Sequence, residues 1–401
     1  MYDSLMRVWR PPVALLLFAV VQANGAEGFP AFEKHTIDTS FDNGYQVSVA
    51  DVDCDGKPDI LALSTTPSKL VWYRNSTWER YTISSVTERN IDLAPYDVDG
   101  DGDQDLAVAS AFDLGDSTQG GLVQWLECPA DPVRDQEWKL HPIDALPTSH
   151  RVRWADIDGD GRKELLNLPI IGVGASAPEY AAGVQFKAYI VPGDLQAEAW
   201  NATMVDDSLH MAHGLLVARW NGDARDDVLT ASFEGVHVYV SGESGFTKQH
   251  LGEGHVGERP KQGSSEVGAG MLAKDGPRFV ATIEPWHGHE VVVYTPRTDG
   301  AVPWTRGVID SSFKDGHALL CTDLDKDGTD EIVAGYRGEG TSLYIYRYDS
   351  GSASWVRLPL DEGGMAAAGL YAADIDQDGW PDIAAIGTST NNVVWYENQR
   401  D

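Results

Sequence analysis

A nine-residue acidic pattern recurs along this chain and constrains its fold more than any other feature. The pattern has acidic residues at positions 1, 3, 5 and 9 and a glycine at position 6. Its clear copies begin at Asp51, Asp97, Asp156, Asp323 and Asp374. A degraded copy begins at Arg219, and the segment 271–278 keeps the phase but has lost the carboxylates. The chain therefore contains seven repeats of roughly 50 to 60 residues.

Strand-like segments surround each acidic turn. In the first repeat, residues 45–50 precede the turn, residues 60–63 follow it, and residues 70–73 and 78–83 complete the repeat. These segments are rich in β-branched and aromatic residues and lack helical periodicity. Four strands per repeat match the size of one propeller blade. The sequence thus predicts an all-β fold, a seven-bladed β-propeller of four-stranded blades.

The two ends of the chain predict how the ring closes. Residues 32–37 resemble the fourth strands at 78–83, 138–143 and 304–309, yet they precede the first repeat. The last repeat ends after its third strand, at residues 393–397. We therefore predict that the N-terminal strand completes the last blade, which removes an exposed sheet edge.

The first residues predict the compartment. A basic start precedes an apolar run at 13–21, and small residues follow at 23–26, as in a secretory signal peptide. We predict a signal peptide over 1–25 and a single propeller domain over 26–401, secreted to the extracellular space. No later stretch approaches ~20 consecutive apolar residues, so no membrane span and no membrane partner are expected.

Charge and cysteine content exclude several classes of partner. The chain has 30 Lys and Arg against 62 Asp and Glu, a net charge of −32, which argues against nucleic acid because phosphate binding needs clustered basic residues. Cys54, Cys128 and Cys321 allow at most one disulfide and match no zinc site. Sequons at Asn75 and Asn201 fit a secreted glycoprotein. We expect a monomer.

The acidic turns have the pattern of calcium sites. Carboxylate oxygens in a tight turn, with glycine at the bend, suit a hard cation that takes six to eight oxygen ligands. We predict Ca²⁺ in the five intact turns, where it holds the first two strands of a blade together and has no catalytic role. The predicted ligands are Asp51, Asp53, Asp55, Asp59, Asp97, Asp99, Asp101, Asp105, Asp156, Asp158, Asp160, Glu164, Asp323, Asp325, Asp327, Glu331, Asp374, Asp376, Asp378 and Asp382.

A second group of residues shares one phase at the other end of the first strands. Six residues before the first turn position stand Tyr45, Ile91, His150, His213, His317 and Ala368. Equivalent positions of a propeller lie at equal depth around its axis, so three histidines should meet in one funnel. A single histidine on a strand is usually a packed core residue, but three in one phase indicate a site.

Loops between second and third strands should open on the same face. In the fifth blade, which has lost its acidic turn, the loop at 283–289 contains Glu284, Trp286, His287 and His289, and in the third blade a long insertion at 170–182 contains Tyr180. The residues that we predict to bind substrate in this funnel are Arg153, Asp92, Glu284, Trp286, His287, His289, His317 and Arg337. The alternative is that Arg153 pairs with a loop carboxylate and that His289 faces solvent.

The acidic turns resemble FG-GAP/VCBS repeats along nearly the whole predicted mature chain. Within that class, segments 90–95, 149–154 and 283–288 resemble the fungal L-rhamnose-α-1,4-D-glucuronate lyases, which act on gum arabic side chains. They also resemble the propeller domain of the aldos-2-ulose dehydratases, and that resemblance stops at the propeller. Both groups eliminate across a sugar C–O bond. The resemblance implies a polysaccharide lyase, a carbon–oxygen lyase that performs β-elimination on a uronate-containing glycan.

The predicted residues suit such an elimination. Arg151, Arg153 or a cation in the central channel would neutralise the uronate carboxylate, and His150 or His213 would remove the proton at C5. Tyr180 or a second histidine would protonate the leaving oxygen. Two alternatives stay open: a glycan- or protein-binding propeller without catalysis, and a sugar dehydratase or glycoside hydrolase on the same fold. Hydrolysis would need a carboxylate pair such as Glu234 and Glu284.

Overall fold

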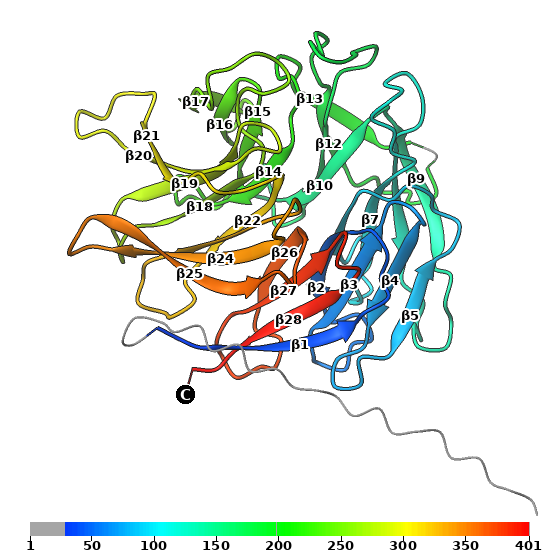
Figure 1. The fold of residues 1–401 in the computed structure, drawn as a ribbon. Coiled ribbons are helices and arrows are strands. Elements are labelled where there is room, and N and C mark those ends of the chain that lie inside the picture. Colours follow the sequence, from blue (N-terminus) through cyan, green and yellow to red (C-terminus); the bar gives the residue numbers. More distant parts are fainter. Residues whose placement is uncertain (1–28, 198, 401) are drawn as a thin grey trace, which may run out of the picture.

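The computed structural model describes residues 29–400 except residue 198, so the predicted signal peptide over 1–25 lies outside the described residues. The described residues form seven four-stranded antiparallel sheets and no helix, which confirms the all-β propeller (Figure 1). No helix that is long and apolar enough to span a membrane occurs in this part of the chain.

Six blades follow one another along the chain, each with its four strands in sequence order. Blade 1 contains β2 (Gly44–Ala50), β3 (Asp59–Ser64), β4 (Lys69–Tyr73) and β5 (Arg80–Ser84); blade 2 contains β6 (Asp92–Tyr96), β7 (Asp105–Ser110), β8 (Leu122–Glu127) and β9 (Lys139–Ala145). Blade 3 contains β10 (Ser149–Ala155), β11 (Glu164–Pro169), β12 (Phe186–Ile190) and β13 (Asn201–Asp206); blade 4 contains β14 (Gly214–Ala218), β15 (Asp227–Ser232), β16 (Gly235–Val240) and β17 (Thr247–Gly252). Blade 5 contains β18 (Val267–Met271), β19 (Arg278–Glu284), β20 (Glu290–Thr295) and β21 (Thr305–Asp310); blade 6 contains β22 (Gly316–Thr322), β23 (Glu331–Tyr336), β24 (Ser342–Asp349) and β25 (Ser354–Glu362).

The seventh blade joins the two ends of the chain. It contains β26 (Ala367–Ala373), β27 (Asp382–Gly387), β28 (Val393–Asn398) and, as its outer strand, β1 (Phe32–Asp38). In Figure 1 the blue β1 runs alongside the red β28. The predicted closure is confirmed, and pairing of β1 with β28 leaves the ring without a broken blade.

The predicted fourth strand of blade 1 began two residues too early. Trp78 has φ of 54° and its N–H donates to the carbonyl of Arg74, so this residue belongs to a turn, and the strand starts at Arg80. An aromatic residue such as Trp78 favours a strand assignment from sequence. Here its backbone conformation is set by the turn that precedes the strand.

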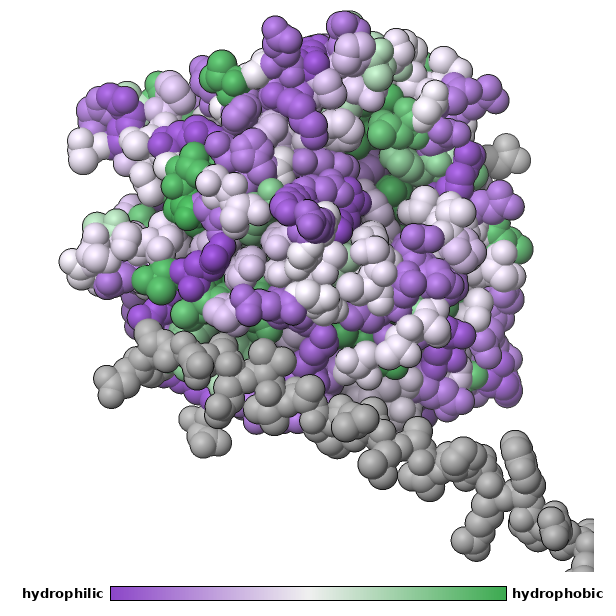
Figure 2. Space-filling model, in the orientation of Figure 1, coloured by the Kyte–Doolittle hydropathy of each residue, from purple (hydrophilic) through white to green (hydrophobic). Residues whose placement is uncertain are grey.

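The hydrophobic core lies between the blades. Seven clusters of buried residues each draw on two neighbouring blades; the cluster between blades 1 and 2, for example, joins Trp72 and Leu61 to Leu106 and Leu126. Each blade thus buries both faces of its sheet, which accounts for the nearly continuous apolar second and third strands. The face of the molecule in Figure 2 is mostly hydrophilic, with small separate hydrophobic patches.

The acid at position 9 of each turn fastens the turn to its own blade. Asp59 is fully buried and accepts hydrogen bonds from the N–H groups of Val52 and Asn75, at 2.9 and 2.7 Å. Asp227 makes the same two bonds in the degraded turn of blade 4, to Trp220 and Ser241. The position-9 acid therefore has a structural role that does not require an ion. The glycine at position 6 has a left-handed φ, as the bend requires, in all five intact turns.

A second set of acids binds tyrosine hydroxyls between blades. The hydroxyl of Tyr73 donates to Asp38, at 2.7 Å, and the hydroxyl of Tyr239 donates to Asp206, at 2.5 Å. Hydrogen bonds to a charged group contribute about 1.5–3 kcal/mol each. Some of the many acidic side chains therefore stabilise contacts between blades. The same contact recurs as Tyr189 to Asp144, Tyr346 to Asp310 and Tyr396 to Asp361.

The cysteines and the two sequon asparagines have different environments in the fold. Cys54, Cys128 and Cys321 are all free thiols. The side-chain nitrogen of Asn75 donates to the carbonyls of Pro58 and Ile375, so this sequon is engaged inside the fold, while Asn201 is exposed.

A buried histidine on β16 should make the fold sensitive to mild acid. Burial, with Lys248 and His250 nearby, lowers the pKa of His237 from 6.5 to about 3. Because the folded-state pKa is depressed, its contribution to stability is complete above pH 6.5 and is lost as pH falls towards 3. We expect the wild-type protein to lose about 1 kcal/mol between pH 6.5 and 5.5 from this group. Thermal unfolding of His237→Gln should lack that decline, and parallel pH curves for the two proteins would contradict the expectation.

Candidate active site

Four first strands carry a β-bulge at the same point. In β2, β10, β22 and β26 the register skips one residue, and the skipped residues are Tyr45, His150, His317 and Ala368. A bulge leaves its extra residue unpaired and re-aims the side chain. Here it directs Tyr45, His150 and His317 across the axis towards one another, because the Tyr45 hydroxyl lies 3.1 Å from Nε2 of both histidines.

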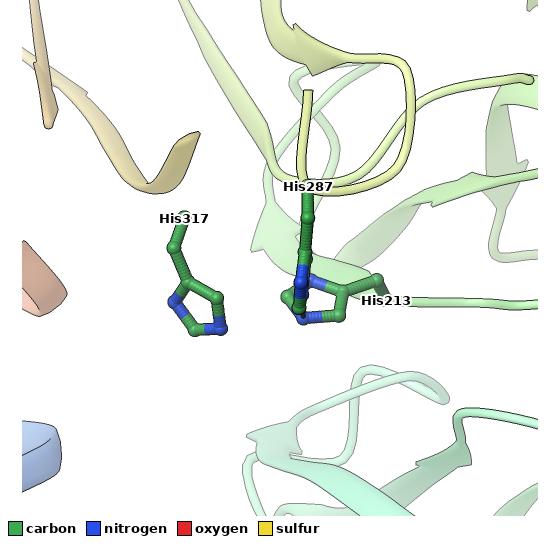
Figure 3. Close-up of side chains that lie close together, drawn as sticks. All are labelled: His213, His287 and His317. Atoms are coloured by element: carbon green, nitrogen blue, oxygen red, sulfur yellow. Dashed lines mark hydrogen bonds between the residues drawn. The ribbon is translucent and has the colours of Figure 1, made fainter. Parts of the chain in front are cut away.

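The histidines form one cluster of rings. His213 has ring-centre distances of 4.7 Å to His150, 5.0 Å to His317 and 5.0 Å to His287. Figure 3 shows His213, His287 and His317 brought together from three separate segments. His287 comes from the loop at 283–289, as predicted for the second-to-third-strand loops. The equivalent positions in the repeats therefore predicted the cluster of His150, His213 and His317. The expectation that second-to-third-strand loops open on the same face predicted His287.

Burial keeps this cluster uncharged. It lowers the pKa of His150, His287 and His317 well below the usual value, and the positive charges of Arg151, Arg337 and neighbouring imidazoles lower it further. Burial likewise raises the pKa of the Tyr45 hydroxyl. At neutral pH the site therefore contains neutral imidazoles, which can accept protons or bind a cation, and a protonated phenol, which can donate one.

Glu266 contacts the histidine cluster through His213. The sequence analysis did not predict this residue. Its Oε1 lies 2.8 Å from Nδ1 of His213 and accepts a hydrogen bond from Arg151, also at 2.8 Å. Burial would raise the pKa of Glu266, but Arg151 and His213 outweigh it and keep the carboxylate ionised. Glu266 stands six residues before Leu272, at the phase position of blade 5. Counting six residues back from Leu272, within the segment 271–278 of blade 5, as was done for the turns of the other blades, would have identified Glu266.

Three of the histidines fit a divalent metal ion. Nitrogen atoms of His213, His287 and His317 lie within 4.8 Å of one another. The outer nitrogens of two rings are fixed, since Nδ1 of His213 faces Glu266 and Nδ1 of His317 lies 2.7 Å from the carbonyl oxygen of Ala368. Metal-binding histidines usually donate their second N–H to a carboxylate or carbonyl in this way. The donor set suits zinc or a similar transition metal.

Replacing His287 by alanine should therefore weaken metal binding. We expect the affinity for Zn²⁺ at this cluster to fall at least about 10- to 100-fold, the range that even second-shell changes produce. Isothermal titration with Zn²⁺ would measure it. His289→Ala is the matched control, because His289 lies two residues along the same loop with 53% of its side chain exposed. Equal zinc binding by both variants would contradict a metal site at the three histidines.

The cluster opens to the surface beside His287. The His287 ring lies against Trp286, with centres 4.6 Å apart, and its Nδ1 lies 3.3 Å from the Arg337 guanidinium, which is paired with Asp315. A cavity of about 410 Å³ adjoins this point, and its lining includes His255, Lys261, Pro285, His287, His289, Lys314 and Asp315. The mouth thus combines an aromatic face with cationic side chains.

The buried arginine has a different role from the one predicted. Only 3% of the Arg151 side chain is exposed, and its charge is balanced by Glu266. Because it holds Glu266 against His213, Arg151 positions the cluster and does not face a substrate carboxylate. The first predicted base, His150, and the second, His213, are also buried, at 1% and 0% exposure.

Four other predicted site residues lie elsewhere. Tyr180 packs in a separate apolar cluster with Phe233. Arg153 is ion-paired at 2.6 Å with the fully buried Asp92, which lies on strand β6 and not in a loop as the alternative interpretation of Arg153 supposed. Glu284 is fully buried and bonded to Arg306, Ser264, Thr282 and Tyr294, so it is not available to a ligand or as half of a hydrolytic pair.

Arg153 and Asp92 line a second cavity, on the propeller axis. This cavity has a volume of about 510 Å³ and is lined by first strands of all seven blades. Its residues lie between the histidine level and the acidic turns along each strand, so it extends from Glu266 towards the turn face. The histidine cluster therefore separates two spaces, the surface cavity beside His287 and the axial cavity.

The acidic turns present clustered oxygens. Candidate cation groups include Asp51 with Asp53 and Asp59, Asp97 with Asp99 and Asp101, and Asp156 with Asp158 and Asp160. All of these oxygens come from one turn each, as the pattern predicted. These turns offer only oxygen donors, which calcium prefers. The histidine cluster offers nitrogen donors, so calcium is better suited to the turns than to the cluster.

Two family models match the chain. Residues 120–297 match the β-propeller domain of aldos-2-ulose dehydratase, and residues 51–108 and 323–385 match an FG-GAP-like repeat. These matches confirm the resemblance to FG-GAP repeats and to the dehydratase propeller.

Individual relatives agree with the family models. The aldos-2-ulose dehydratase of Phanerodontia chrysosporium is 25% identical over 372 residues, a match that covers 84% of this chain and 40% of the relative. The chain thus spans less than half the length of that enzyme.

Solved structures share the fold alone. BBS1N, solved in complex with ARL6DN, has a TM-score of 0.55 at 13% identity, over 93% of this chain and 97% of that chain. A chain of the mitotic checkpoint complex has a TM-score of 0.55 at 12% identity, over 98% and 100%.

Proposed function

Because the chain is a homologue of aldos-2-ulose dehydratase, a carbohydrate-processing enzyme, we propose that it is a secreted carbon–oxygen lyase acting on a uronate-containing glycan. The observation that carries the proposal is the neutral cluster of four histidines around the Tyr45 hydroxyl. It brings proton acceptors, a proton donor and a candidate cation site to one point beside a surface cavity.

Tyr45 and His150 form the proton-transfer pair. Tyr45 as a residue is partly exposed, whereas His150 is fully buried, so in our proposal the phenol is the group of the pair that meets the sugar. As the phenol oxygen takes the proton from C5, its own proton passes to Nε2 of His150. The C4–O bond then breaks, the C4=C5 double bond forms, and the proton returns through Tyr45 to the leaving oxygen. One pair of residues thereby serves as base and acid.

The charge that develops on the uronate needs a positive partner. Lys261 lines the adjoining cavity, where its ammonium can meet a carboxylate, and Arg337 lies beside His287 in an ion pair with Asp315. His213, His287 and His317 would hold a divalent cation, which would supply a further positive charge next to the carboxylate when bound. Glu266 and Arg151 fix the orientation of His213 and thereby keep the cation ligands in place.

Product analysis tests the proposal. The protein is incubated, with Ca²⁺ and Zn²⁺ present, with a panel of uronate-terminated glycans, and products are followed by mass and by the absorbance of a C=C bond conjugated to a carboxylate. Elimination gives fragments whose masses sum to that of the substrate, whereas hydrolysis adds one water. If no uronate glycan yields the new absorbance, the lyase proposal fails.

The similarity to a dehydratase favours a second candidate, loss of water from a keto-sugar. The same proton-transfer pair could perform it, with hydroxide rather than a glycosyl oxygen leaving. A product one water lighter than a free keto-sugar, without cleavage of any glycan, would favour this activity. Binding of glycans without any change in mass would favour a propeller that only binds.

A further inference from the structure

The strand pair that closes the ring carries two glutamates directly opposite each other. In the β1–β28 register, Glu33 faces Glu397, and His35 faces Trp395. Nε2 of His35 lies 2.5 Å from Oε2 of Glu397, and the ring stacks on Trp395, with centres 4.5 Å apart. Like charges at directly opposite positions destabilise an antiparallel pair. The arrangement therefore needs a positive partner.

Blade 2 shows the same arrangement with the positive partner built in. In the β8–β9 register, Trp125 faces His141, and the rings stack with centres 4.3 Å apart. Nε2 of His141 lies 2.7 Å from Glu127. Opposite Glu127 stands Lys139, whose ammonium lies 3.0 Å from the same carboxylate oxygen. Position for position, Glu33 in blade 7 replaces Lys139, so a carboxylate stands where the other blade has a cation.

The three polar groups of blade 7 have the geometry of a metal site. Ligand atoms of Glu33, His35 and Glu397 lie within 4.8 Å of one another, and all three side chains are partly exposed. Two carboxylates and an imidazole combine oxygen with nitrogen donors. Calcium and magnesium prefer oxygen alone, whereas zinc binds histidine and carboxylate together.

We propose that Glu33, His35 and Glu397 form a zinc site that fastens the N-terminal strand to the C-terminal strand. The ion takes the place that the Lys139 ammonium occupies in blade 2. Its ligands come from the two ends of the chain, so it binds the closed ring and not an open one, and it stabilises closure by mass action. This site is separate from the histidine cluster on the axis and from the acidic turns, and it requires neither catalysis nor calcium.

Two charge exchanges test the site. Glu33→Lys copies the blade 2 arrangement, so it should fold without zinc while it loses zinc binding at the closure. Lys139→Glu copies the blade 7 arrangement and should create a new site in blade 2. In isothermal titration with Zn²⁺ on calcium-saturated protein, we expect Glu33→Lys to bind one equivalent fewer than wild type. Lys139→Glu should bind one equivalent more.

The location of the ion can be measured independently. Zinc should slow hydrogen exchange in β1 and β28 of the wild-type protein and leave these strands unchanged in Glu33→Lys. If Glu33→Lys proves unstable, Glu33→Gln keeps the shape of the side chain and should weaken this binding event at least about tenfold. Equal zinc equivalents and equal zinc-induced protection in wild type and both Glu33 variants would overturn the proposal. Zinc at the axial histidines contributes equally to all of these proteins and cancels in the comparison.

Discussion

Replacing Tyr45 by phenylalanine should reduce the elimination rate about 10²- to 10⁴-fold, the range of a general acid–base group. The substitution keeps the ring, so packing between β2 and its neighbours is preserved, and it removes only the hydroxyl that lies 3.1 Å from both His150 and His317. Steady-state rates of formation of the unsaturated product, together with the melting temperature, would separate lost chemistry from lost stability.

Tyr180→Phe is the matched control for this substitution. Tyr180 was the tyrosine favoured by the sequence, but it packs in an apolar cluster with Phe233. We expect its variant to keep activity within about threefold of wild type, as for substitutions that leave the reacting groups untouched. Loss of activity in Tyr180→Phe with full activity in Tyr45→Phe would reverse the assignment.

Removing calcium should cause the largest loss of stability. A site filled at 100 times its Kd contributes about 2.7 kcal/mol, so five filled turns together should lower the melting temperature by about 15–20 °C when the ion is chelated. A bound ion would balance the carboxylates that crowd each turn. Differential scanning fluorimetry with EDTA, followed by addition of excess Ca²⁺, would measure the loss and its reversal.

The calcium effect should grow with pH. Burial, with the neighbouring turn carboxylates, raises the pKa of Asp59, Asp105 and Asp382 from 3.8 to about 7 in the ion-free turns. A raised folded-state pKa stabilises the ion-free fold at low pH, and this contribution is lost as pH rises from 4 to 7. Calcium needs the ionised carboxylates, so its contribution increases over the same range. EDTA should therefore lower the melting temperature more at pH 8 than at pH 5.

Two aspartates at position 5 provide a control for the turns. Asp101 in the intact turn of blade 2 and Asp223 in the degraded turn of blade 4 each accept a hydrogen bond from the N–H two residues later, at 3.1 and 2.8 Å. Asp101→Asn should reduce the calcium-dependent part of the melting temperature, while Asp223→Asn should leave it unchanged. Equal effects of the two substitutions would show that the backbone bond matters and the ion does not.

The fold was predictable because its information is repeated. Seven copies of one turn fixed the blade count, and the similarity of residues 32–37 to internal fourth strands fixed the closure. His150, His213 and His317 were found because equivalent strand positions lie at equal depth, and His287 was found because its loop opens on the same face.

The parts that failed depend on contacts between distant residues. Tyr45 was in the phase set, but an aromatic residue at a strand start reads as packing until a bulge is seen to direct it to the axis. Glu284 reads as a free loop acid, yet Arg306, 22 residues later, neutralises it inside the blade. From the sequence, Arg151 is expected to bind an anionic ligand, but it forms an ion pair with Glu266, 115 residues away. The repeat phase identifies the positions of Tyr45 and Glu266, but it does not show which residues they contact.

The pairing of β1 with β28 has a consequence for biosynthesis. The interblade clusters are shared by neighbouring blades, so each blade made during translation leaves one apolar face uncovered until the next is complete. The first and last blades can cover each other only after residue 398 has been made and has met residue 32. A nascent chain is therefore an open arc until residue 398 has been made, and the acidic turns, which fold within single blades, are the parts that can become ordered earlier.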